Sequence, residues 1–314
     1  MKKIAFLFPG QGAQYIGMAM DFVKKDPEFK KILTEFDKKN KTNLFQIMKE
    51  GPLEDLKKTK YTQPAILFHS IVAMRSLIAE IDIKPDFVAG HSLGEFSALV
   101  ANGVLNFEDA MYLVHKRGEF MIAANEDQPF AMSAILGSDV DTVKQICKKA
   151  SQEGIVVAAN FNTPVQTVIS GTRSGVEKAN ELLKKEGAKR IIPLKVGGPF
   201  HSPLIKKAGI WLSEEMKNFD FRKTNIPVIS NVSALPETNP KKLRENLTKQ
   251  VTSSVLWVDS IKYLLEQSIE IFIEFGPKKV LAGMMKKIDR KAKVLSIDSV
   301  EDLDNIKQEL RKNV

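Results

Sequence analysis

A single Gly-x-Ser-x-Gly pattern, from Gly90 to Gly94 with Ser92 at its centre, is the first indication of chemistry in the chain. Both glycines lack a Cβ, so a strand can turn abruptly into a helix there. Such a turn exposes the serine hydroxyl, and the next amides, beginning with that of Leu93, face the place where an oxyanion would form. A chance match in a Gly/Ser-rich loop is the alternative. Because the flanking residues favour a strand end and then a helix, we interpret Ser92 as a nucleophile.

A serine hydroxyl becomes a good nucleophile when a base within about 3 Å accepts its proton. Four histidines are available, namely His69, His91, His115 and His201. We expect His91 to brace the turn, because neighbouring side chains at a sharp turn point in different directions. His69 and His115 lie inside helical patterns, which favours packed or surface roles. His201 follows a Gly-Gly-Pro loop at the predicted start of a helix, and this position makes it the best candidate for the base.

The composition indicates an ordinary globular protein of 314 residues, with 43% hydrophobic and 27% charged residues. Its one cysteine, Cys147, excludes an internal disulfide and a cysteine-based metal cage. The helical pattern around Cys147 predicts a buried structural thiol. The formal net charge of +9 favours an anionic partner. Since no nucleic-acid motif is present, an acidic protein or a phosphorylated carrier is the expected partner, and DNA and RNA are not.

Neither a secretory signal nor a membrane span is expected. The apolar run Ile4–Phe8 is short, is interrupted by Pro9, and reads as a buried first strand. The most apolar predicted helix, at residues 65–79, carries His69 and Arg75, which do not suit a membrane span. We therefore expect a reduced, cytoplasmic setting.

Alternating strand and helix patterns predict an α/β fold with a mostly parallel central sheet in a large, hydrolase-like subdomain. The loop at residues 9–14 follows the first strand and would open at the carboxyl edge of that sheet, where ligands bind. From residue 127 to 197 the order becomes β-α-β-β-α-β, as in a ferredoxin-like module. We therefore expect a large subdomain of residues 1–126 and 198–314 and an inserted ferredoxin-like subdomain of residues 127–197.

Helix and strand bounds follow from the same patterns. Helices are expected over residues 17–39, 43–49, 52–58, 62–80 and 106–125, with Asn106 as a cap of the last. Strands are expected over residues 130–136, 155–160, 165–170, 189–194, 228–231, 269–275 and 293–297.

Several short stretches occur in one order along almost the whole chain. They are Phe8–Gln14, Thr62–Ala65, Gly90–Glu95, Arg117–Gly118, Asn160 and Asn162 with Ser170–Gly171, Phe200–Ser202 and Glu274–Pro277. Each alone is a weak signal, but together they resemble the malonyl-CoA:acyl carrier protein transacylase family.

This resemblance implies roles for particular residues. Ser92 would be acylated, with His201 as its base. The imidazole would be oriented by the main-chain carbonyl of Gln250 instead of by an aspartate. The backbone amides of Gln11 and Leu93 would form the oxyanion hole.

The resemblance also implies a set of substrate-binding residues. Arg117 would pair with the malonyl carboxylate, whose two oxygens match a planar guanidinium fork; a helix-surface arginine is the alternative. Phe200 would lie where a methyl branch projects, and Gln63 would contact substrate. Met121 would line the same pocket or belong to the core. Gly198 replaces a histidine common in the modular relatives, which leaves selectivity against methylmalonyl open.

The implied reaction is a ping-pong transfer from malonyl-CoA through Ser92 to the phosphopantetheine thiol of an acidic acyl carrier protein, in fatty-acid synthesis. No metal or other cofactor is implied, and a monomer is expected. A basic surface would suit the CoA phosphates and an acidic carrier.

Other readings remain open on the residues alone. A serine esterase or thioesterase of the α/β-hydrolase type expects a late histidine, whereas His201 is followed by a long stretch without another. A patatin-like lipase expects an Asp-Gly pair, which the chain lacks. A catalytically silent carrier-docking protein would have no need to keep Ser92, His201 and Arg117 together.

Overall fold

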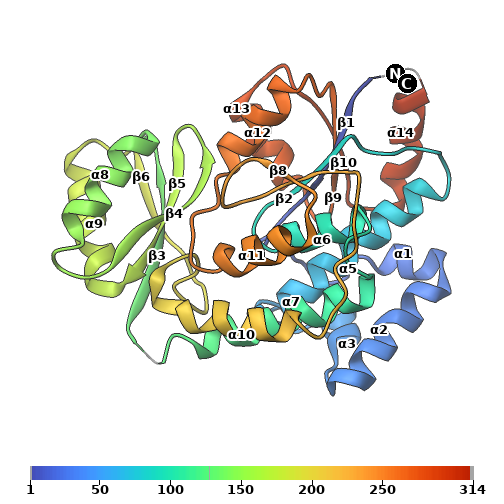
Figure 1. Ribbon diagram of the computed structural model, residues 1–314, viewed down its shortest axis with the longest axis horizontal. Helices are drawn as coiled ribbons and strands as arrows, with labels where there is room; N and C mark the ends of the chain where they lie inside the picture. The colour runs from blue at the N-terminus through green and yellow to red at the C-terminus, as the bar shows by residue number, and fades with distance from the viewer. Residues whose placement is uncertain (1, 127, 312–314) are drawn as a thin grey trace.

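The computed structural model describes residues 2–126 and 128–311, which form two sheets with helices around them (Figure 1). Sheet A has the strand order β10-β9-β1-β2-β7-β8. These strands are Lys293–Ile297, Ile271–Phe275, Ile4–Phe8, Phe87–Gly90, Val228–Ile229 and Pro236–Glu237. Neighbouring strands are parallel except for the β7–β8 pair.

Strand β1 shows why sheet A is buried on both faces. All five of its residues are apolar and buried, which is typical of a central parallel strand. Phe6 and Phe8 face the large core that contains helix α5 (Thr59–Ile78). Ala5 and Leu7 face the opposite way, toward helices α12 (Trp257–Glu266) and α13 (Val280–Ile288). Helices therefore cover both faces, and the carboxyl edge of the sheet is left for the site.

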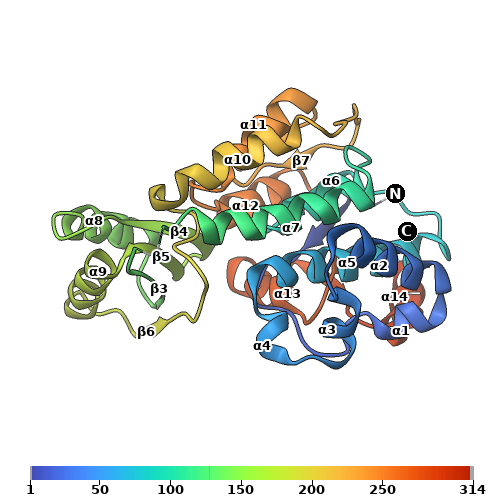
Figure 2. The ribbon, with the colours of Figure 1, turned by 90° about the horizontal axis from the view of Figure 1, so that it is seen from below.

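Most of the remaining helices surround this sheet, whereas α8 and α9 lie at the second sheet (Figure 2). The remaining helices are α1 Met20–Lys25, α2 Pro27–Asn40, α3 Leu44–Glu50, α4 Leu53–Leu56, α6 Gly94–Ala101, α7 Phe107–Ala123, α8 Val140–Ala150, α9 Arg173–Lys185, the 3-10 turn η1 Pro203–Ile205, α10 Lys206–Met216, α11 Pro240–Gln250 and α14 Val300–Arg311. None of the described helices combines the length and apolar character that a membrane span requires.

Sheet B lies at the other end of the molecule, with α8 and α9 packed on it (Figure 1). Its strand order is β4-β5-β3-β6, and neighbouring strands are antiparallel. These strands are Val156–Thr163, Gln166–Thr172, Phe130–Leu136 and Arg190–Pro193. The order β3-α8-β4-β5-α9-β6 is the predicted ferredoxin-like arrangement. The fold class is thereby confirmed, while the subdomain limits at residues 127 and 197 stay predictions.

The two sheets are joined by backbone hydrogen bonds as well as by the chain. Val255, just before α12, donates to Ala159 O at 2.8 Å and accepts from Phe161 N at 3.0 Å. These bonds place β4 beside the segment that links α11 to α12. One face of β3, with Met132 and Ala134, also belongs to the large core. Sheet B is therefore held against the carboxyl edge of sheet A.

Some predicted bounds are wrong for local reasons. The helix expected at 17–39 is two helices, because Asp26 is extended, caps α2 by accepting from Glu28 N, and precedes Pro27. Asn106 does stand at the N-cap position of α7 as predicted, but its side chain makes no capping bond and instead bonds Asp109 and Arg222.

Candidate active site

A strained turn between β2 and α6 carries Ser92. Its φ of 52° lies in the left-handed region, which residues with a Cβ rarely adopt. A Cβ on Gly90 would lie 1.9 Å from the carbonyl carbon of Gly94, and a Cβ on Gly94 would lie 2.1 Å from Phe8 O. Both glycines are therefore required for β1, β2 and α6 to approach one another.

Ser92 and His201 form a hydrogen-bonded pair. Ser92 Oγ lies 2.8 Å from His201 Nε2, and His201 Nδ1 lies 2.8 Å from the main-chain oxygen of Gln250. A carbonyl only accepts, so Nδ1 holds the imidazole proton and Nε2 is free to accept from the serine hydroxyl. Burial, together with the positive charge of Arg117, lowers the pKa of His201 to about 3. The imidazole is therefore neutral near pH 7, as a base must be.

Arg117, from α7, lies in the interior and reaches the same serine. Its Nη2 donates to Ser92 Oγ at 3.1 Å and to Gln250 Oε1 at 2.9 Å, and its Nη1 donates to Gln63 Oε1 at 2.8 Å. Its Nε is buried and has no partner in the described part of the chain. Burial lowers the pKa of Arg117 to about 10, so it remains charged near pH 7. With an exposed fraction of 1%, Arg117 is not a helix-surface arginine.

The cavity in front of Ser92 has a volume of about 250 Å³. It is lined by the other predicted residues, Gln11, Leu93, Gln63, Met121 and Phe200. No hydrogen bond joins the main-chain N–H of Gln11 or Leu93 to another described residue. Both amides are therefore available to a ligand. Gln63 Nε2 contacts Met121 Sδ at 3.7 Å, so one side chain links Met121 to Arg117.

None of the remaining histidines forms a hydrogen bond with the Ser92 hydroxyl among the contacts of the described residues. His91 Nε2 bonds Asn162 Oδ1 at 2.8 Å and its ring packs on Trp257, so it braces the turn as expected. His69 and His115 are buried within α5 and α7.

Burial raises the pKa of the Cys147 thiol to about 12. Within residues 2–126 and 128–311, no cluster of three or more His, Cys, Asp and Glu side chains could hold a metal ion.

Sequence reasoning missed two polar residues beneath Ser92. Asn231 Oδ1 accepts from Ser92 N at 2.7 Å, and Asn231 Nδ2 donates to Gly90 O at 2.7 Å, so this side chain clamps both ends of the turn. Glu95 Oε2 accepts from Gln250 Nε2 at 2.6 Å. Asn231 lies 139 positions from Ser92, and no local pattern signals such a contact. Glu95 ends the stretch Gly90–Glu95 that contributes to the family resemblance, but the sequence predicted no role for its side chain.

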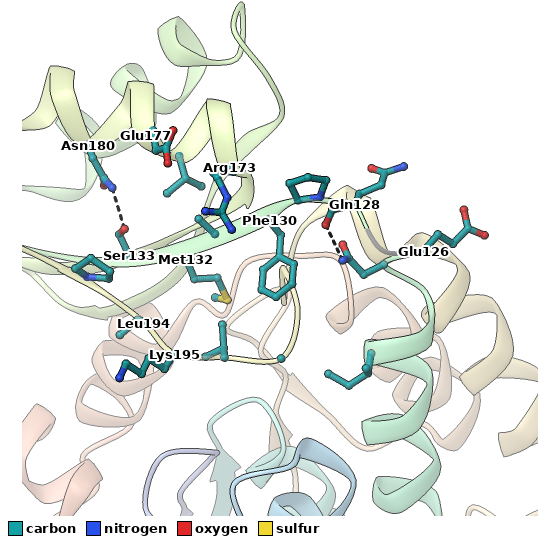
Figure 3. Close-up of a pocket in the computed structure, with 18 of the residues that line it drawn as sticks. Glu126, Gln128, Phe130, Met132, Ser133, Arg173, Glu177, Asn180, Leu194 and Lys195 are labelled. Carbon is teal, nitrogen blue, oxygen red and sulfur yellow. Dashed lines mark hydrogen bonds between the residues drawn. The ribbon is translucent and has the colours of Figure 1, made fainter. Parts of the chain in front are cut away.

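A second, larger cavity of about 900 Å³ lies where the end of α7 meets sheet B (Figure 3). Among the residues that line it, Asn180 donates a hydrogen bond to Ser133 and Asn125 donates one to the main-chain oxygen of Gln128. It shares Met132, Leu194 and Val196 with the cavity at Ser92, but none of the predicted site residues line it.

Comparison with known proteins places this geometry in context. A family model described as an acyl transferase domain matches residues 5–310. The chain is 46% identical over 313 residues to the malonyl CoA-acyl carrier protein transacylase of Bacillus subtilis, covering 99% of this chain and 98% of the relative. The protein of the same name from Staphylococcus aureus strain MW2 is 41% identical over 304 residues, covering 96% of this chain and 98% of the relative.

Solved structures are similar to this chain over almost its whole length. The malonyl CoA-acyl carrier protein transacylase of Coxiella burnetii superposes with a TM-score of 0.94 at 36% identity, covering 98% of both chains. A malonyl-transacylase in complex with a type II PKS acyl-carrier protein superposes with a TM-score of 0.93 at 34% identity, covering 98% of this chain and 99% of the other.

Proposed function

This chain belongs to the malonyl CoA-acyl carrier protein transacylase family, and from that membership we propose that it transfers malonyl groups from malonyl-CoA to the phosphopantetheine thiol of an acyl carrier protein. The product would supply fatty-acid synthesis. The enzyme is an acyltransferase. The geometry of the site supports the roles that we propose for its individual residues.

One observation supports malonyl transfer above other serine chemistry. Ser92 Oγ lies within hydrogen-bond distance of both a neutral imidazole, His201, and a buried guanidinium, Arg117. A nucleophile with its base would suit any ester or thioester. A buried cation with an unpaired Nε beside that nucleophile suits an acyl group that carries its own carboxylate.

In the first half-reaction, Ser92 Oγ attacks the thioester carbonyl while His201 Nε2 accepts the hydroxyl proton. The N–H groups of Gln11 and Leu93 donate to the oxyanion of the tetrahedral intermediate. When the intermediate collapses, the C–S bond breaks and His201 returns the proton to the CoA sulfur. The malonyl group is then an ester of Ser92, with its free carboxylate on Arg117.

In the second half-reaction, the carrier thiol gives its proton to His201 and attacks the ester carbonyl. The same two amides hold the oxyanion. The C–O bond to Ser92 then breaks, and His201 returns the proton to Ser92 Oγ. The enzyme is regenerated, and no oxidant or reductant enters the balance.

The rest of the proposal concerns selectivity and setting. Phe200 and Met121 line the cavity and would limit branched acyl groups. The net charge of +9 suits an acidic carrier and the CoA phosphates. We further propose that the enzyme is a cytoplasmic monomer that works without a metal or other cofactor.

The test of the proposed function is a covalent adduct. Wild-type enzyme incubated with malonyl-CoA should gain the mass of one malonyl group, and added acyl carrier protein should remove it. The Ser92→Ala variant should gain none, because the hydroxyl that forms the ester is absent. An undiminished adduct on that variant would contradict the mechanism. Rapid hydrolysis of the wild-type adduct without a carrier would favour a thioesterase.

A further inference from the structure

Glu95 is a buried carboxylate that takes no part in the proposed reaction. It is the second residue of α6 and has an exposed fraction of 1%. Its Oε2 accepts from Gln250 Nε2 at 2.6 Å and from the Asn231 main-chain N–H at 3.3 Å. Burying a carboxylate costs free energy that hydrogen bonds must offset. These bonds come from the layer directly beneath the nucleophile.

The Gln250 side chain connects Glu95 to the reacting groups. Besides bonding Glu95, its Nε2 donates to Ser92 O at 2.9 Å, and its Oε1 accepts from Arg117 Nη2 at 2.9 Å. The main-chain oxygen of Gln250 accepts from His201 Nδ1 at 2.8 Å. One residue therefore contacts the turn, the guanidinium and the base.

The chemistry of these groups allows one orientation of the Gln250 carboxamide. A half-turn about its last bond would exchange its oxygen and its NH₂ group. An ionised carboxylate only accepts hydrogen bonds, and a guanidinium only donates them. With Glu95 on one side and Arg117 on the other, the turned amide would oppose donor to donor and acceptor to acceptor. The Arg117 guanidinium and the Ser92 main-chain oxygen select the orientation in which an oxygen faces Arg117, and ionised Glu95 reinforces it.

We propose that Glu95 is a positioning residue that acts through the Gln250 side chain to hold the Arg117 guanidinium where it meets the carboxylate of the acyl group. This inference rests on the proposed function, because it assigns Glu95 to the selection of a diacid at that same site. Glu95 does not line the cavity, so its influence reaches the substrate through Arg117.

The Glu95→Gln variant tests this role, because glutamine keeps the size of the side chain but donates as well as accepts. Loading of the enzyme is followed in a single turnover by intact mass, with malonyl-CoA and with acetyl-CoA. The ratio of malonyl to acetyl loading rates should fall roughly tenfold, because the bond between the Gln250 carboxamide and the charged Arg117 guanidinium loses its fixed geometry. The ratio cancels the folded fraction of the protein, so instability alone does not change it.

Two further variants locate the effect. Gln250→Met removes the carboxamide and keeps the main-chain oxygen, so in that background Glu95→Gln should leave the ratio unchanged. Glu274→Gln is the matched control, because Glu274 is also a buried carboxylate but bonds Leu281 N and Ala282 N at the start of α13. Its ratio should equal that of the wild type.

An unchanged ratio in Glu95→Gln would overturn the proposal, as would an equal fall in the presence and absence of the Gln250 carboxamide. If Glu95→Gln does not fold, Gln250→Met alone must lower the ratio by a similar factor, and an unchanged ratio there refutes the role. Wild-type enzyme that takes no malonyl group would instead refute the proposed function.

Discussion

Among the residues of the site, Arg117 has the environment least usual for its type. Arginine side chains are rarely fully buried, yet Arg117 is buried and its Nε has no partner among the described residues. A buried donor without an acceptor costs free energy. A carboxylate beside Arg117 would supply the missing acceptor, so the cost is recovered when a diacid thioester binds.

Replacing Arg117 with alanine should therefore lower malonyl loading far more than acetyl loading. A hydrogen bond to a charged group contributes about 1.5–3 kcal/mol, which corresponds to roughly a 10–100-fold fall in the malonyl rate relative to the acetyl rate. Single-turnover loading with each thioester measures both rates. Arg244→Ala is the control, because Arg244 also has a buried unpaired Nε but packs on Phe221 away from the cavity. Equal losses for the two thioesters in Arg117→Ala would show that it is not the carboxylate partner.

At this scale the sequence predicted the residues that belong to recognisable stretches, including Ser92, Arg117 and His201, and the structure brings their side chains together. It did not predict the layer beneath them. Asn231 and the Gln250 side chain come from segments far along the chain and meet Glu95 only in the folded protein. Their residue types are ordinary, and only the three-dimensional packing makes them neighbours.

The element that most constrains the fold is the turn from β2 into α6. Adding one methyl group at Gly90 would place it against the backbone of Gly94, which no side-chain movement relieves. We expect Gly90→Ala to lose about 3 kcal/mol or more of the free energy of unfolding. Gly283→Ala, in the exposed middle of α13 with open space around it, should gain about 0.5–1 kcal/mol. Urea denaturation of both variants checks the pair, and equal stabilities would contradict the steric account.

Elements were predicted well where a pattern is local. The β-α-β-β-α-β order around sheet B follows from short alternating runs and turn residues, and it was correct. Helix bounds failed where one residue overrides the pattern, as Pro27 does between α1 and α2. The two-residue strand β8, Pro236–Glu237, was not predicted because it forms only by pairing with β7.

For the molecule as a whole, buried titratable groups couple stability to pH. Burial lowers the pKa of His69 to about 4 and that of His201 to about 3, whereas it raises the pKa of Glu95 to about 7. The unfolded chain protonates both imidazoles below about pH 6.5, so their contribution to stability is lost as pH falls from that value. Glu95 has the opposite effect on stability. Its pKa is higher in the folded chain than in the unfolded chain, so its protonation favours the folded chain as pH falls.

Together these three groups should lower the free energy of unfolding by about 2 kcal/mol when the pH falls from 7 to 4.5. Urea denaturation at both pH values measures the change. His69→Asn should show a smaller difference between the two pH values, because one of the buried imidazoles that resist protonation in the folded chain is gone. An unchanged difference in that variant would contradict the assignment to His69.

Arg117 donates a hydrogen bond to Ser92 Oγ, and its charge also acts on His201. The charge of Arg117 is one cause of the weak basicity of His201 in the free enzyme. On the proposed pairing, a malonyl carboxylate bound to Arg117 would offset that charge and so raise the basicity of His201, the group that activates Ser92. An acetyl group brings no such charge and meets a weaker base. Selection of malonyl over acetyl groups would then arise in the rate of Ser92 acylation as well as in the affinity of substrate binding.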